Sequence, residues 1–85
     1  MVPTRAARER WLAVFDAAFD RFCGDVESGR DTFLDPYAAE HEAEFFAVAS
    51  EAFFESPNAL RSEYPDLYDL FRGFYRQDPA RRLKD

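Results

Sequence analysis

The sequence predicts an all-α fold of three to four helices. Apolar residues recur every three or four positions along most of the chain, which is the spacing of one helical face. No segment shows the alternation of apolar and polar residues that is typical of a half-buried strand. Prolines and a glycine stand between the periodic segments, where they end one helix or start the next. Because the chain has 85 residues, we expect residues 1–85 to form a single helical domain or a fragment of one.

The first helix is predicted over residues 5–28. Thr4 is a suitable N-cap, and Gly29 is a suitable stop signal. The apolar face consists of residues spaced by four, four, three and four: Trp11, Phe15, Phe19, Phe22 and Val26. Cys23 borders this face, so we interpret it as a small core residue rather than a reactive thiol.

A loop at residues 29–40 and a second helix at residues 42–55 follow. The loop is indicated by Asp35-Pro36, since proline disfavours the helical conformation of the residue before it. It contains three large side chains with apolar surface: Phe33, Leu34 and Tyr37. We therefore expect the loop to pack against the rest of the protein. The second helix presents a broad apolar arc: Phe45, Phe46, Ala49, Ala52 and Phe53.

Two shorter helices are predicted at residues 57–63 and 66–77. Ser56 is the candidate N-cap of the first, with Pro57 at its first position, where the missing N–H of proline is tolerated. In the second, four residues are expected to face inward: Leu67, Leu70, Phe71 and Phe74.

The composition excludes several classes of partner. The net charge is −6, which disfavours binding to nucleic acid and to anionic membranes, because both need concentrated positive charge. No run approaches the roughly 20 apolar residues of a membrane span, and the N-terminus lacks the apolar stretch of a signal peptide. Cys23, the only cysteine, excludes an internal disulfide and is typical of a reducing compartment. A soluble cytoplasmic protein is expected.

Aromatic residues are unusually frequent for so small a chain. They make up 18% of the sequence and include ten phenylalanines. A chain of this size buries only about 60–65% of the surface that its unfolded form exposes. Two explanations stay open: a compact, phenylalanine-rich helical bundle, or rings that pack against a partner or against a part of the protein outside this sequence.

His41-Glu42 resembles the start of an HExxH zinc motif but does not complete it. In that motif, histidines at i and i+4 share one helical face and bind one zinc ion. Here the i+4 position is Phe45, which cannot ligate a metal. His41 is also the only histidine of the chain, so we interpret it as a solvated residue near a helix N-terminus.

Glu44 is the carboxylate whose position is unusual. It directly precedes Phe45-Phe46 and lies at the border of the apolar arc rather than opposite it. Glutamate is seldom buried without a partner, so this placement raises a functional role as an alternative, although the pattern alone still favours a solvated helix edge.

Three segments resemble one known family. They are DPYAAE at residues 35–40, AEFFAVASEAFFE at 43–55 and FYRQDP at 74–79. Together they resemble the C-terminal part of the Mlc titration factor A family, which are glucose-regulated zinc metallopeptidases of the gluzincin type. The likeness extends from about Thr4 to Pro79. It implies that the chain is the C-terminal helical part of a zincin-like metallopeptidase.

The resemblance assigns roles to two residues. In that family, an HExxH helix in the preceding part of the chain supplies two zinc-binding histidines and the catalytic glutamate. The resemblance implies that Glu44 is the third zinc ligand. It also implies that Tyr37, seven residues earlier, donates a hydrogen bond to the oxyanion that forms during peptide hydrolysis.

The chain also departs from the family pattern, because it contains no HExxH and carries His41-Glu42 where members usually have Asn-Pro. It is therefore expected to be a fragment of an aminopeptidase-like enzyme, inactive alone, whose zinc site and peptide substrate require a missing N-terminal half as partner. The alternative is a non-enzymatic helical module that binds a transcriptional repressor or self-associates.

Overall fold

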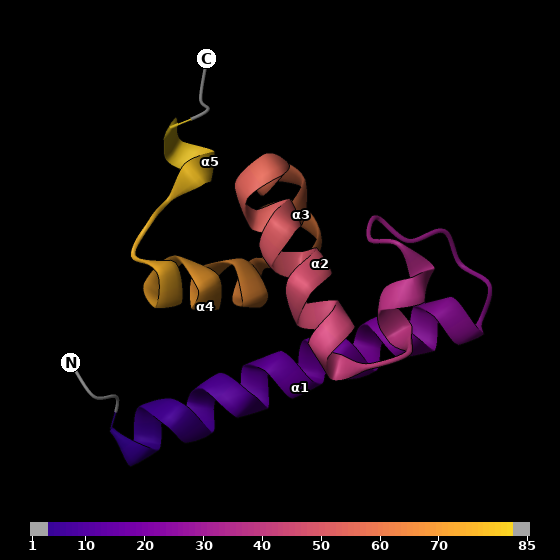
Figure 1. Cartoon of the computed structure of the whole chain (residues 1–85), viewed down its shortest axis with the longest axis horizontal. Helices are drawn as coiled ribbons and strands as arrows, with labels where there is room; N and C mark the ends of the chain where they lie inside the picture. Colours follow the sequence, from indigo (N-terminus) through magenta and orange to yellow (C-terminus); the bar gives the residue numbers. More distant parts are fainter. Residues whose placement is uncertain (1–3, 83–85) are drawn as a thin grey trace.

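The computed structural model describes residues 4–82, and within them the chain is helical with no strand (Figure 1). The predicted all-α class is therefore confirmed. The elements are α1 (Arg5–Glu27), the 3-10 helix η1 (Pro36–Ala39), α2 (Glu42–Glu55), α3 (Pro57–Glu63), α4 (Pro65–Tyr75) and α5 (Pro79–Arg82).

The helices form a thin slab. The long helix α1 runs along one edge, and both η1 and α4 pack against it (Figure 1). Helix α2 contacts η1, α3 and α4, and α5 packs on α3. The molecule measures 39 × 37 × 16 Å along its principal axes. Since packed helices lie about 8–10 Å apart, the shortest dimension accommodates two helix layers at most. Each helix therefore has a face at the molecular surface.

Phe45 of α2 occupies the centre of the core. Its side chain is fully buried. The ring centroid lies 5.5 Å from that of Phe15 and 5.3 Å from those of Phe19 and Phe22, all on α1. Tyr64, at the junction of α3 and α4, lies edge-on to Phe45 at 6.5 Å. One residue of α2 thus joins α1 to the C-terminal helices, as the predicted faces of both helices require.

A second group of rings surrounds Phe53, which is also fully buried. Its centroid lies 5.1 Å from Tyr68 and 5.9 Å from Phe71. Phe46 connects the two groups through Phe71, at 5.8 Å. The core does not bury every large apolar residue: among residues 4–82, five side chains remain well exposed, namely Leu12, Phe33, Tyr37, Phe54 and Phe74.

The ends of α1 follow the sequence signals. The Thr4 hydroxyl accepts a hydrogen bond from the Ala7 N–H at 3.0 Å, so Thr4 is the N-cap. At the other end, Gly29 has a φ of 78°, a left-handed conformation that only glycine adopts without a steric penalty.

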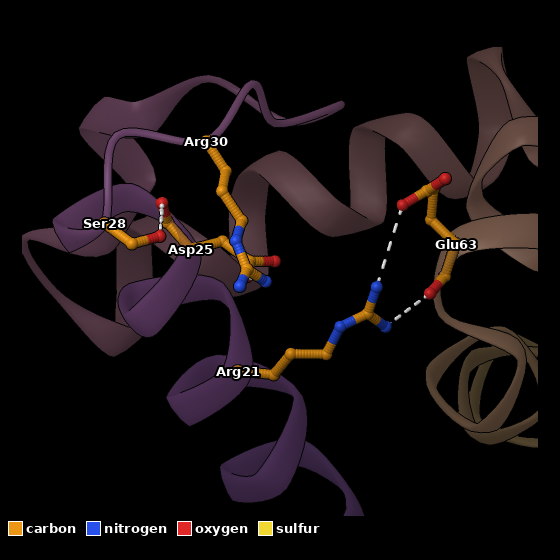
Figure 2. A network of polar contacts seen from close by, with 5 residues as sticks. All are labelled: Arg21, Asp25, Ser28, Arg30 and Glu63. Carbon is orange, nitrogen blue, oxygen red and sulfur yellow. Dashed lines mark hydrogen bonds and ion pairs between the residues drawn. The ribbon is translucent and has the colours of Figure 1, made fainter.

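Arg21 connects α1 to the α3–α4 junction, 42 residues further along the chain (Figure 2). It donates a hydrogen bond to the main-chain carbonyl of Glu63 at 2.5 Å and pairs with the Glu63 carboxylate at 3.7 Å. Its guanidinium also lies 4.3 Å from the centre of the Tyr64 ring. The carboxylate contact is half-exposed on both sides and so adds little stability.

We expect Arg21→Ala to destabilise the chain by about 1–2 kcal/mol, because it removes a charge-assisted hydrogen bond and a cation–π contact together. Glu63→Gln is the matched control. It removes only the exposed ion pair and is expected to cost about 0.5 kcal/mol or less. Urea denaturation of both variants measures the difference in stability. Equal losses of stability would show that the ion pair, rather than the hydrogen bond and the cation–π contact, accounts for the effect of Arg21.

Tyr68 attaches α5 to α4. Its hydroxyl donates to the Asp78 carboxylate at 2.5 Å and accepts from the Ala80 N–H at 3.1 Å. Burial, followed by the hydrogen bond to Asp78, raises the pKa of Tyr68. The same hydrogen bond is the main cause that lowers the pKa of Asp78.

The lowered pKa of Asp78 predicts a specific pH dependence. A carboxyl group whose pKa is lower in the folded chain stabilises the fold above its unfolded pKa of about 4, and this contribution disappears as the pH falls through the folded value. Tyr68→Phe removes the hydrogen bond, so the free energy of unfolding of this variant should fall less steeply between about pH 4 and pH 2. Urea titrations across this range test it. Parallel profiles for the two proteins would show that Tyr68 does not control the pKa of Asp78.

The structure differs from the sequence-based expectations in several places. The loop at 29–40 contains η1, and the helix expected at 66–77 begins at Pro65 and ends at Tyr75. It ends early because Arg76 is left-handed, with a φ of 57°. Helix α5 was not predicted. Phe74 faces α1 and α2 as predicted, with its ring centroid 5.8 Å from Trp11 and 6.1 Å from Phe46, but its side chain is 54% exposed rather than buried.

Candidate functional site

Glu44 lies in the first turn of α2, where its side chain is half-buried. Its neighbour Phe45 is fully buried and fixes the orientation of this turn relative to α1. The N-terminus of a helix carries a partial positive charge, which favours the carboxylates of Glu42 and Glu44 there. A carboxylate held on a packed helix, at the border between core and solvent, is suited to bind a cation.

Tyr37 lies on η1. This short helix is capped by Asp35, whose carboxylate accepts a hydrogen bond from the Tyr37 N–H at 3.0 Å. Leu34 and Ala38 are buried, so the loop packs against the rest of the protein as predicted, but Phe33 and Tyr37 do not take part in this packing. The Tyr37 ring itself is 57% exposed. Its hydroxyl is therefore accessible to a ligand.

The two predicted site residues lie on adjacent elements, because η1 packs against α2. Within residues 4–82, however, the side chains of Tyr37 and Glu44 form no hydrogen bond with each other or with a third group. The structure thus places the two residues on neighbouring elements without joining them.

The residues that the structure describes do not fit a complete zinc site. Among them, no group of three or more histidine, cysteine, aspartate or glutamate side chains is placed to hold a metal ion. Catalytic zinc sites usually have three protein ligands. His41 occupies the N-cap position of α2, is exposed and makes no capping hydrogen bond with its side chain. These observations agree with its interpretation as a solvated residue.

Cys23 has the environment of a structural cysteine. Its side chain is partly buried, and the thiol lies 3.6 Å from the Ala39 carbonyl of η1. Burial, and then the nearby carboxylates of Asp20 and Glu27, raise the pKa of the thiol. Since the thiolate is the nucleophile, a raised pKa opposes reactivity at neutral pH.

A large groove lies between α1 and α4, with Phe46 of α2 on its wall. We call it the Leu12 groove; its volume is about 690 Å³. Its apolar walls are formed by Trp11, Leu12, Phe46, Leu70 and Phe74. The sequence analysis did not predict this groove. The sequence carries no signal for it, because Leu12 stands three residues before Phe15 and seven before Phe19 and so has the spacing of the buried face of α1.

None of the helices in the described part of the chain has the length and apolar character needed to cross a membrane.

Comparison with known proteins identifies relatives of the chain. The sequence model of the family described as Glucose-regulated metallo-peptidase M90 matches residues 1–76. The chain is similar to Mlc titration factor A of Pectobacterium atrosepticum, with 57% identity over 76 residues, which are 87% of this chain and 29% of that protein. It is also similar to the uncharacterized protein slr2042 of Synechocystis, with 34% identity over 71 residues, 84% of this chain and 26% of that protein.

Mlc titration factor A of Yersinia pestis is 53% identical over 51 residues, which are 60% of this chain and 19% of that protein. No solved structure matches the chain. The chain thus spans less than a third of the length of the curated relatives that it matches. The family match covers nearly all of its residues, and the chain therefore belongs to the M90 family of glucose-regulated metallopeptidases.

Proposed function

We propose that this chain contributes one zinc ligand, Glu44, and one hydrogen-bond donor, Tyr37, to a zinc-dependent peptidase. The observation that carries the proposal is the position of Glu44. It is a half-buried carboxylate in the first turn of a packed helix, in a segment that matches a metallopeptidase family.

Glu44 is chemically suited to this role. Zinc binds carboxylate oxygens readily, and a catalytic site combines three protein ligands with an open position for water or substrate. Phe45 anchors the helix turn below Glu44, so the backbone that carries the carboxylate does not have to be ordered when the ion binds. The low polarity of the adjacent ring strengthens the attraction between carboxylate and cation.

Tyr37 is suited to assist without binding the ion. A phenol donates a hydrogen bond to a developing negative charge and adds no cation of its own. Its ring is exposed, and its backbone is fixed by Asp35 and by the buried Ala38. We propose that the hydroxyl contacts the carbonyl oxygen of a peptide substrate.

The remaining ligands must come from outside this chain, because its only histidine, His41, lies exposed at the N-cap of α2. The isolated chain is therefore expected to be inactive. We assign the missing groups to the part of a family-length protein that this chain does not span, since the Pectobacterium relative is covered over only 29% of its length.

The test uses a chimera, in which this chain replaces the 76 matching residues of the Pectobacterium relative. We expect zinc-dependent peptide hydrolysis by the chimera and none by the isolated chain. Glu44→Gln should abolish the activity of the chimera. Glu51→Gln is the control, because Glu51 lies two turns further along the same helix and is exposed. Zinc-dependent turnover by the pure isolated chain, lost on Glu44→Ala, would overturn the proposed division of the site.

A second candidate is a non-enzymatic module that binds a transcriptional repressor. Two of the three relatives cited above are called Mlc titration factor A. The exposed side chains of Leu12, Phe54 and Phe74 offer apolar surface for a protein partner. Sedimentation of the chain with and without such a repressor separates the two candidates, because a peptidase part requires no complex with the repressor.

A further inference from the structure

The Leu12 groove exposes apolar side chains to solvent. Leu12 and Phe74 on its walls are 51% and 54% exposed, although both are large hydrophobic residues. This exposure shows that no other segment of residues 4–82 covers them. Burial of this surface would be favourable at about 25 cal/mol per Å² of apolar area.

The groove has a charge opposite to that of the chain as a whole. Its rim carries Arg8, Arg10 and Arg72 against one carboxylate, Asp69. Arg72 is paired with Asp69 at 2.5 Å. Arg8 and Arg10 form no ion pair with any residue between 4 and 82. A net positive rim on a chain of charge −6 favours an occupant that presents carboxylates.

This charge argues against a second copy as the occupant. In a twofold dimer each patch faces an identical patch, so the net positive rim of one copy would meet the net positive rim of the other. Like charges across an interface are unfavourable. The groove is therefore better suited to bind a different polypeptide segment than to bind the same groove of a second copy.

The groove is also continuous with the proposed zinc-ligand region. A smaller hollow of about 310 Å³ shares Trp11, Leu12 and Phe46 with it and extends to Glu42 and Ala43 at the start of α2. A segment seated on Leu12 would therefore reach the helix turn that carries Glu44.

We propose that the Leu12 groove is the docking surface for the part of a family-length protein that this chain does not span. The occupant is an apolar segment with carboxylates opposite Arg8 and Arg10, and its seat beside Phe46 brings it to the first turn of α2. The inference rests on the proposed function for the identity of the partner. It is supported by the 71% of the Pectobacterium relative that lies outside the match, the complement of the 29% covered.

Thiol labelling tests the groove directly. In a Cys23→Ser background, cysteine is introduced by Leu12→Cys, Phe74→Cys or Phe33→Cys, and modification is followed by peptide mass spectrometry. Phe33 is the control, since it is 40% exposed and does not line the groove. Because thiol modification requires access, Leu12→Cys and Phe74→Cys should react at least about tenfold more slowly in the chimera than in the isolated chain, and Phe33→Cys equally fast in both.

Two results would overturn the proposal. One is equal reactivity of Leu12→Cys in the isolated chain and in a chimera that unfolds cooperatively. The other is protection in the isolated chain that rises with concentration, which identifies a second copy as the occupant. If the chimera does not fold, the same substitutions at the aligned positions of the intact Pectobacterium relative give the same two outcomes.

The zinc affinity of the chimera separates this proposal from the proposed function. Protection of Leu12→Cys together with an unchanged zinc affinity on Glu44→Gln would support the Leu12 groove as a docking surface and would reject Glu44 as a zinc ligand. Loss of zinc binding on Glu44→Gln with an accessible Leu12→Cys would support Glu44 as a zinc ligand and would reject the Leu12 groove as a docking surface.

Discussion

Phe45→Ala is expected to destabilise the chain by about 3–5 kcal/mol, the usual cost of replacing a fully buried phenylalanine with alanine. The side chain has no exposed surface and contacts rings of α1 and of the α3–α4 junction. A chain of 85 residues has a total stability of roughly 4–13 kcal/mol on the usual scale per residue. The substitution should therefore remove a large fraction of it. Chemical denaturation followed by circular dichroism measures the loss.

Phe33→Ala is the matched control for this prediction. It removes the same ring from a position that is 40% exposed, so a loss of about 1 kcal/mol or less is expected. If Phe45→Ala cost no more than Phe33→Ala, Phe45 could not be the residue that joins α1 to the C-terminal helices.

Glu44→Gln is expected to lower the zinc affinity of the chimera by more than about 100-fold. Removal of groups that only support a ligand typically costs 10–100-fold in metal affinity or activity, so loss of a ligand should cost more. Glutamine keeps the shape of the side chain but removes the charge. Competition with a zinc-binding dye measures the affinity, and circular dichroism confirms that α2 is retained.

Glu51→Gln in the same helix should leave the zinc affinity unchanged. A similar loss for both variants would mean that the general negative charge of α2 attracts the ion. In that case Glu44 would not be a specific ligand.

Much of the fold follows from the local sequence. The spacing of Trp11, Phe15 and Phe22 predicts the buried face of α1, and Thr4 predicts its start, because periodicity and capping depend on neighbouring residues alone. The proline after Ser56 likewise predicts the start of α3. These signals do not depend on the rest of the chain, so the sequence alone was enough to predict the starts of α1 and α3 and the buried face of α1.

Other features depend on contacts between distant residues and could not be predicted. Arg21 reaches Glu63 across 42 positions of sequence, and Tyr68 holds α5 through Asp78. Phe74 has the spacing of a buried residue, but its exposure is decided by which helix covers the last turn of α4. The Leu12 groove arises in the same way, from the crossing of α1 and α4.

The candidate site was only partly predictable for a related reason. The position of Glu44 beside Phe45 shows in the sequence as a carboxylate at the border of an apolar arc. Its role depends on ligands that the described residues do not supply, so it follows from the family resemblance and stays a proposal.

Zinc coordination in the chimera tests this role most directly. In a crystal structure of the zinc-loaded chimera, with the ion located by anomalous scattering, we predict a carboxylate oxygen of Glu44 at about 2.0–2.2 Å from the zinc. A fully coordinated zinc ion with Glu44 outside its coordination sphere would contradict the proposal.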